Sequence, residues 1–137
     1  MNSEIVTTSI SFLALLVSIW AACTSRKSYL STLKAIFYCN NYKIEPLTNN
    51  VTFYINNNGK FVHLKNLVAK TTNVELVKNL PIDIPSGEMY ELQVKYKDDS
   101  TKIKNSTIKI NINYLDKDGH SHTCTMCMDK GKVIFEN

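Results

Sequence analysis

The sequence predicts an all-β protein: an antiparallel β-sandwich of about seven or eight short strands that follows one N-terminal transmembrane α-helix. Three observations lead to this prediction. The chain begins with a long uncharged stretch, apolar and polar residues alternate in several later segments, and residues typical of turns separate those segments. A chain of 137 residues has room for one domain and an appendage. We expect the anchor in residues 1–27 and the sandwich in residues 28–137.

The first element is the expected membrane span. Residues 5–25, IVTTSISFLALLVSIWAACTS, contain no charged side chain, and at ~1.5 Å per residue a helix of this length covers the ~30 Å hydrocarbon core. Its hydroxyl groups can bond to the carbonyls of the same helix. Trp20 suits a membrane interface, and Arg26 and Lys27 follow the stretch directly. The positive-inside rule then predicts a single-pass protein of the cell membrane, with its N-terminus outside and its C-terminal domain in the cytoplasm.

Two other interpretations of this segment remain open. A cleaved secretory signal normally begins with positively charged residues, whereas MNSE, residues 1–4, offers only the amino terminus. A lipoprotein signal ends in small residues before a cysteine. The segment WAAC, residues 20–23, fits in its last three residues but has Trp20 where a leucine-like residue is usual. If the domain is exported, a Cys39–Cys124 disulfide is possible.

Small residues on one face of the same helix suggest a contact between helices. Ala14, Ser18 and Ala22 are spaced four apart and therefore lie on one helix face. Small side chains at this spacing let two membrane helices approach closely. A homo-oligomer through this face is one interpretation. The other is that alanine and serine are simply common in such segments.

The part after the anchor is predicted to consist of strands. In residues 108–114, IKININY, isoleucines alternate with Lys and Asn, and Tyr114 shares the isoleucine side. A period of two is typical of a half-buried strand. Residues 51–55 and 90–96 alternate in the same way. Further strands are expected at 34–40, 62–69, 73–78 and 132–136, and residues 28–37 could instead continue the first helix.

Turn residues separate these strands. Residues 56–59, NNNG, predict a tight connection because Asn and Gly tolerate positive φ. Residues 85–88, PSGE, predict a turn before the strand at 90–96. Residues 116–119, DKDG, predict a hairpin turn that closes at Gly119. The spacing of strands and turns is that of an antiparallel sandwich.

Several of these segments also carry a family resemblance. After the uncharged helix come SRKS at residues 25–28, INNNG at 55–59, IPSGE at 84–88 and INYLDKDG at 112–119. The pattern resembles a loose group of small bacterial and phage membrane-anchored proteins and covers most of the chain. The resemblance implies an immunoglobulin-like β-sandwich and a membrane location, and no activity. The antibody-type Cys-Trp-Cys arrangement is missing, since the only tryptophan, Trp20, lies in the membrane segment.

The segment HSHTCTMC, residues 120–127, holds two histidines and two cysteines and raises the question of a metal site. His120 and His122 lie ~6.6 Å apart along a strand, so both could reach one Zn²⁺. Cys124 lies a further ~6.6 Å along, and Cys124 and Cys127 point to opposite faces. No second Cys-x-x-Cys or histidine pair occurs elsewhere in the sequence. An ordinary strand is therefore favoured over a metal site with His120 and His122 as ligands, and over a redox pair.

If this segment is the strand that follows the turn at 116–119, alternation also predicts its buried face. Cys124, Met126 and Met128 fall on one side, where thiol and thioether groups pack well beside isoleucines. Residues 123, 125 and 127 fall on the other side. We expect the first set in the core.

Composition argues against two classes of function. Charged residues make up 20% of the chain, and the net charge of +4 is spread without the basic run that tracks a phosphate backbone. We expect no nucleic acid partner. The sequence lacks Gly-x-Ser-x-Gly, a phosphate-binding glycine loop and His-Glu-x-x-His. We therefore expect no enzyme and no cofactor.

The function expected from the sequence is a membrane-anchored interaction module, or an accessory subunit of a membrane assembly, that binds another membrane or cytoplasmic protein. One alternative is a small ligand-gated effector that associates with itself, and another is an exported lipoprotein with a binding domain. Binding would use loops at one end of the sandwich or an exposed sheet edge. The candidate loop residues are Asn57, Asn58, Lys60, Lys117 and His120.

Overall fold

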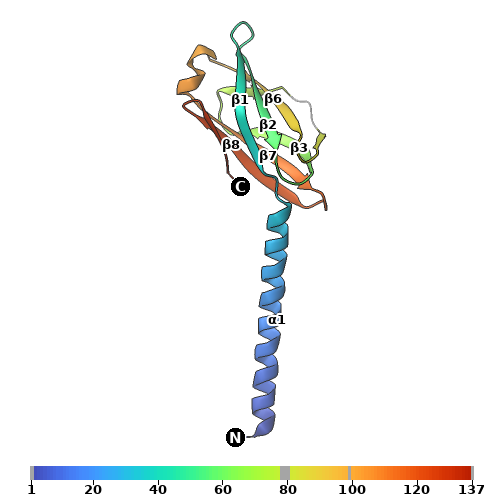
Figure 1. Ribbon diagram of the computed structural model, residues 1–137. Helices are drawn as coiled ribbons and strands as arrows, with labels where there is room; N and C mark the ends of the chain where they lie inside the picture. The colour runs from blue at the N-terminus through green and yellow to red at the C-terminus, as the bar shows by residue number, and fades with distance from the viewer. Residues whose placement is uncertain (1, 78–80, 99, 137) are drawn as a thin grey trace. The chain divides into compact units, whose positions relative to one another are not determined.

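Helix α1 spans Ser3–Leu33 and precedes two antiparallel β-sheets in the computed structural model of the chain (Figure 1). The structure describes residues 2–77, 81–98 and 100–136. The chain divides into two units, Met1–Leu33 and Lys34–Asn137, and we call the second the β unit. The helix thus continues beyond the expected boundary at residue 27.

Helix α1 is apolar in composition, and several of its hydroxyl groups form hydrogen bonds within the helix. Thr7, Thr8, Ser9, Ser11 and Ser18 each donate a hydrogen bond to the carbonyl four residues earlier, at 2.8–2.9 Å. This confirms that the helix satisfies its own hydroxyls, as a lipid environment requires. The helix is long and apolar enough to cross a membrane, and an N-terminal signal sequence has the same properties.

The β unit contains nine strands among the described residues, one or two more than expected. In chain order these are β1 (Phe37–Glu45), β2 (Asn50–Asn57), β3 (Val62–Ala69), β4 (Val74–Leu76), β5 (Ile82–Ile84), β6 (Met89–Tyr96), β7 (Thr107–Asp116), β8 (Ser121–Asp129) and β9 (Lys132–Glu136). A short 3-10 helix, η1 (Ser100–Asn105), lies between β6 and β7. One sheet has the order β1-β2-β6-β4 and the other β5-β3-β7-β8-β9.

Most strand predictions agree with the structure, and three need correction. The strand expected at 34–40 begins at Phe37 and runs to Glu45. The helix expected to reach residue 37 ends at Leu33. Strand β5 was not expected, because three residues are too few to display an alternation. The strand expected at 73–78 is β4, whose last expected residue, 78, lies outside the described residues.

One hydrophobic core receives side chains from both sheets. Alternation buries Ile108, Ile110, Ile112 and Tyr114 of β7, as expected. Strand β8 pairs with β7 along its whole length and buries Cys124, Met126 and Met128 at 1% exposure or less. The core prediction for HSHTCTMC is therefore confirmed.

Four segments lie at the same end of the β unit as its first residue, Lys34. We call this end the Lys34 end. They are residues 34–36, 58–61, 85–88 and 117–120. The Asn58 N–H donates to the Ile36 carbonyl at 2.8 Å, and the Gly87 N–H donates to the Asn57 carbonyl at 2.7 Å. Strands β3 and β7 pair Val62 with Asp116, which brings 58–61 beside 117–120.

Candidate functional site

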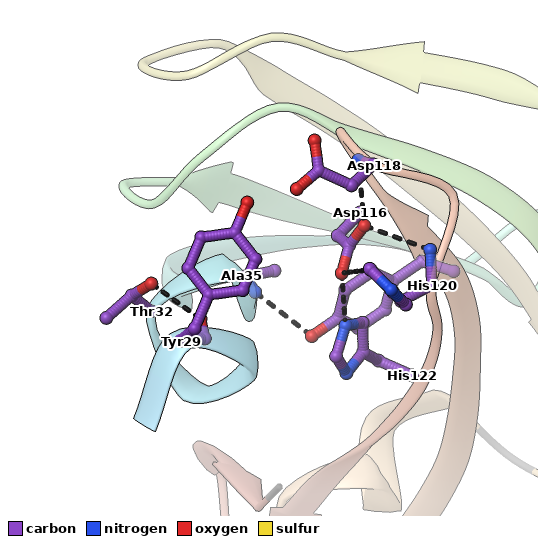
Figure 2. A network of polar contacts seen from close by, with 8 residues as sticks. Tyr29, Thr32, Ala35, Asp116, Asp118, His120 and His122 are labelled. Carbon is purple, nitrogen blue, oxygen red and sulfur yellow. Dashed lines mark hydrogen bonds and ion pairs between the residues drawn. The ribbon is translucent and has the colours of Figure 1, made fainter. Parts of the chain in front are cut away.

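The β7–β8 turn is organised around the Asp116 carboxylate, whose side chain is fully buried (Figure 2). Oδ1 accepts hydrogen bonds from the backbone N–H groups of Asp118 at 2.9 Å and His120 at 3.0 Å. Such bonds are available because an aspartate at the start of a tight turn can accept from the amides that follow it. The carboxylate therefore stabilises the turn that the DKDG segment predicted.

Both histidines of HSHTCTMC face this same carboxylate (Figure 2). His122 Nε2 donates to Asp116 Oδ2 at 2.7 Å, and the imidazole stacks on the Tyr114 ring with centroids 5.3 Å apart. His120 Nδ1 lies 3.3 Å from the same oxygen, without the geometry of a hydrogen bond. The two histidines thus share one buried anionic partner.

The pKa of Asp116 is held below its ordinary value by these contacts. Burial by itself raises the pKa, because it disfavours the charged form. The hydrogen bonds from His122 and from the backbone amides of His120 and Asp118, together with the nearby His120 ring, outweigh that effect. The carboxylate is consequently charged at neutral pH and serves as a fixed acceptor.

The cluster is better suited to stabilising the turn than to metal or redox chemistry. The oxygens of Asp116 are already occupied by N–H donors. Within the described ranges, no three His, Cys, Asp or Glu side chains form a group that could hold a metal ion. All four cysteines are free thiols, so Cys39 and Cys124 form no disulfide. Burial raises the pKa of Cys124 to about 11, which keeps it protonated and unreactive at neutral pH.

Asn57 is the one candidate loop residue that the structure places in the interior, at 1% exposure. Its side-chain amide donates to the carbonyls of Lys60 at 2.8 Å and Ile84 at 3.1 Å, and its oxygen accepts from the Gly59 N–H at 3.0 Å. Because all of these partners belong to the β unit, Asn57 is a structural residue and is withdrawn from the candidate binding surface.

The remaining candidate loop residues come together at the Lys34 end. Asn58, Lys60 and Lys117 are exposed, and the side chain of His120 is 43% exposed. Phe61, next to Lys60, is 37% exposed, although its aromatic ring was not singled out from the sequence. We call Asn58, Lys60, Phe61, Lys117 and His120 the loop surface. It combines two lysines with a partly exposed aromatic ring.

The small-residue face of α1 is exposed in the structure. Ala14, Ser18 and Ala22 are accessible, and the Ser18 hydroxyl is bonded to the Ala14 carbonyl within the helix. Its hydroxyl is therefore satisfied without a second helix.

The sequence placed Asp116 in a turn but did not predict its burial beneath two histidines, and it did not single out Phe61. Asp116 had a detectable signal, since it begins a DKDG turn that two histidines follow within six residues of the aspartate. Phe61 had none, because its exposure depends on how β3 sits in its sheet. No family model matches the chain, and no curated protein matches it.

Proposed function

We propose that the protein is a membrane-anchored, non-enzymatic interaction module that serves as an accessory subunit of a membrane assembly. In this proposal α1 is the single membrane span, the β unit is an immunoglobulin-like domain in the cytoplasm, and the loop surface contacts a protein partner.

The order of the strands supports the immunoglobulin-like part of the proposal. Immunoglobulin sheets have the orders ABED and C′CFG. The orders β1-β2-β6-β4 and β5-β3-β7-β8 correspond to them when β1, β2 and β3 are taken as A, B and C. Strands β4 and β5 then take the D and C′ positions in reversed chain order, and β9 is an additional edge strand. The departure from the standard topology is thus limited to two three-residue strands and one edge.

Charge supports the anchor and its orientation. The uncharged part of α1 is followed by Arg26 and Lys27, whereas Glu4 is the only charged side chain before it. Basic residues favour the cytoplasmic side of a membrane. A C-terminal reporter that is active only after export should therefore stay inactive, and an active reporter, or a mature protein that starts at Cys23, would contradict this part of the proposal.

The proposed binding function is supported mainly by one observation: the residues of the loop surface lie close together. Residues from two connections far apart in sequence meet because Val62 pairs with Asp116. Lys60 and Lys117 supply two positive charges that favour an acidic partner, although exposed Asp118 lies beside Lys117, and Phe61 supplies an apolar contact. Residues 34–36 adjoin the same loops, since Asn58 bonds to Ile36. The loop surface therefore adjoins the residues that directly follow α1 in the sequence.

Purification from the native host tests this function. The tagged full-length chain is extracted in mild detergent, and co-eluting proteins are identified by mass spectrometry. We expect a stoichiometric partner that the Lys60→Glu/Lys117→Glu variant loses. The matched control is Lys65→Glu/Lys70→Glu, which reverses two exposed lysines of β3 and the residues after it. Equal recovery of the partner by both variants, or no partner at all, would reject the loop surface.

A further inference from the structure

Strand β9 is an edge strand of its sheet, and β1 of the other sheet runs close to it, with the Phe37 ring against Phe135. Exposed edges invite pairing with another chain, and proteins usually protect them with bulges or by making them short. Of the four edge strands, β4 and β5 are three residues long, and β1 carries an irregularity between Cys39 and Asn41. Strand β9 has five residues in unbroken register with β8. In the part of the chain that the structure describes, its paired neighbour is β8 alone.

The turn before β9 determines which backbone groups face outward. Lys130 and Gly131 both have positive φ, at 51° and 78°, as in a two-residue type I′ hairpin. Such a turn is closed by a hydrogen-bonded pair, here Asp129 and Lys132. Because inward and outward groups alternate in an antiparallel pair, the N–H and C=O groups of Val133 and Phe135 point away from β8. This edge therefore offers two donors and two acceptors to another strand.

The sequence of β9, KVIFE, is complementary to itself when it is reversed. We propose that β9 pairs antiparallel with β9 of a second copy of the chain, with Ile134 opposite Ile134 at the two-fold axis. This register places Lys132 of each copy opposite Glu136 of the other, so that two pairs of opposite charge form. It also places Val133 opposite Phe135, so the outward backbone groups of both strands meet in hydrogen-bonded pairs.

The side chains of β9 agree with this pairing. Ile134 is 43% exposed, and it forms an apolar pair with Cys127, its partner on β8. Val133 and Phe135 are half-buried against the core, and Phe135 lies 6.0 Å from the Phe37 ring between centroids. Pairing with a second copy would cover the exposed parts of all three apolar residues of the strand.

The dimer has two further physical consequences. An edge of five residues buries less area than a standard interface, so the pairing belongs to the weak, transient class. The two-fold axis is perpendicular to the joined sheet, so the two Lys34 ends lie at opposite ends of it.

Disulfide trapping of the full-length chain in detergent tests the register. Cys23, which is exposed, and Cys127, which lies opposite Ile134 in the same chain, are first changed to Ser. Ile134→Cys then places two thiols opposite each other, with Cβ atoms ~4.5–5.5 Å apart. The control is Val68→Cys, which is 44% exposed and so matched to Ile134. We expect a covalent dimer from Ile134→Cys under mild oxidation and monomer from Val68→Cys.

Charge exchange tests the pairing independently, by sedimentation of variants that keep Ile134. Lys132→Glu should raise the dimer dissociation constant by about tenfold, and so should Glu136→Lys. The combined Lys132→Glu/Glu136→Lys variant should restore the wild-type value, which a merely unfolded edge would not do. Equal trapping at positions 134 and 68, or a double variant no better than the single ones, would overturn the proposal. The loop surface is unchanged in all these variants. Recovery of a partner through the loop surface is therefore tested independently of the β9 dimer.

Discussion

At the residue scale, the chemistry of HSHTCTMC is divided between two structural tasks. Cys124, Met126 and Met128 fill the core, while the histidines surround Asp116 at the turn. A motif rich in potential metal ligands thus belongs to a β-strand and the turn before it. The buried carboxylate is the centre of this arrangement and makes a definite prediction.

Replacing Asp116 should weaken the fold and change its response to acid. The pKa of Asp116 is lowered in the folded protein, so its stabilising effect is complete above the unfolded value of about 3.9 and is lost as the pH falls through the lower folded value. Asp116→Asn should reduce the free energy of unfolding by about 1.5–3 kcal/mol at pH 7. As the pH falls from the unfolded value through the lower folded pKa of Asp116, the variant and the wild type should converge, because the wild-type carboxylate becomes protonated.

Urea unfolding in detergent at several pH values measures this effect. Asp98→Asn is the matched control, because Asp98 is exposed and should change stability by less than about 0.5 kcal/mol. A constant difference between Asp116→Asn and the wild type down to pH 2 would contradict the assigned role of the carboxylate.

Two adjacent asparagines should differ sharply. Asn57→Ala removes hydrogen bonds to the carbonyls of Lys60 and Ile84 and from the Gly59 N–H, and should lower the free energy of unfolding by about 1–3 kcal/mol. Asn58→Ala, at an exposed position, should change it by less than about 0.5 kcal/mol. Thermal unfolding of both variants measures the difference. Equal effects would show that the burial of Asn57 does not determine its contribution to stability.

The sequence predicted the burial of Cys124 and Met126 but not that of Asn57 or Asp116, and the reason is physical. Alternation is a local property, so it assigns faces along one strand as soon as the turn before it is known. The burial of Asn57 depends on contacts with Ile84 on β5, and the two candidate loops meet only through the pairing of Val62 with Asp116. Pairings between distant segments leave no mark in the local pattern.

At the element scale, the same distinction separates the strands that were predicted from those that were not. The long alternating strands β6 and β7 were expected within a residue or two of their observed ends. Strand β5 was missed because it is defined only by its pairing with β3. The start of β1 was misplaced because residues 34–36 pack against the loop that contains Gly59.

Gly59 is therefore expected to fix the start of the β unit. A Cβ atom added there would lie 2.7 Å from the Ile36 backbone nitrogen, which cannot move aside as a side-chain end can. Gly59→Ala should lower the free energy of unfolding by about 1–3 kcal/mol and speed hydrogen exchange at the Asn58 amide, which bonds to Ile36.

Gly87→Ala provides the contrast for this test. Gly87 has φ of 82° and no atom within 4 Å of an added Cβ, so its substitution should cost about 1–2 kcal/mol of backbone strain. It should leave exchange at Asn58 unchanged. Faster exchange at Asn58 in both variants would indicate a general loss of stability and no specific contact of Gly59.

At the scale of the whole molecule, the sequence predicted an apolar helix followed by a mostly β unit, and this is what the structure contains. The immunoglobulin-like topology, the orientation in the membrane and the partner are our proposals. They are linked by one feature: the loop surface lies at the Lys34 end, the end of the β unit that follows the helix in the chain.

The contact between the loop surface and a protein partner is tested by site-specific photocrosslinking in the native host. A photoreactive residue replaces Lys60 in one full-length chain and Lys117 in another. A third chain carries it at Lys70, an exposed position at the other end of β3. We expect one crosslinked product of the same mass from positions 60 and 117 and none from position 70. No product at 60 and 117, or the same product at all three positions, would contradict it.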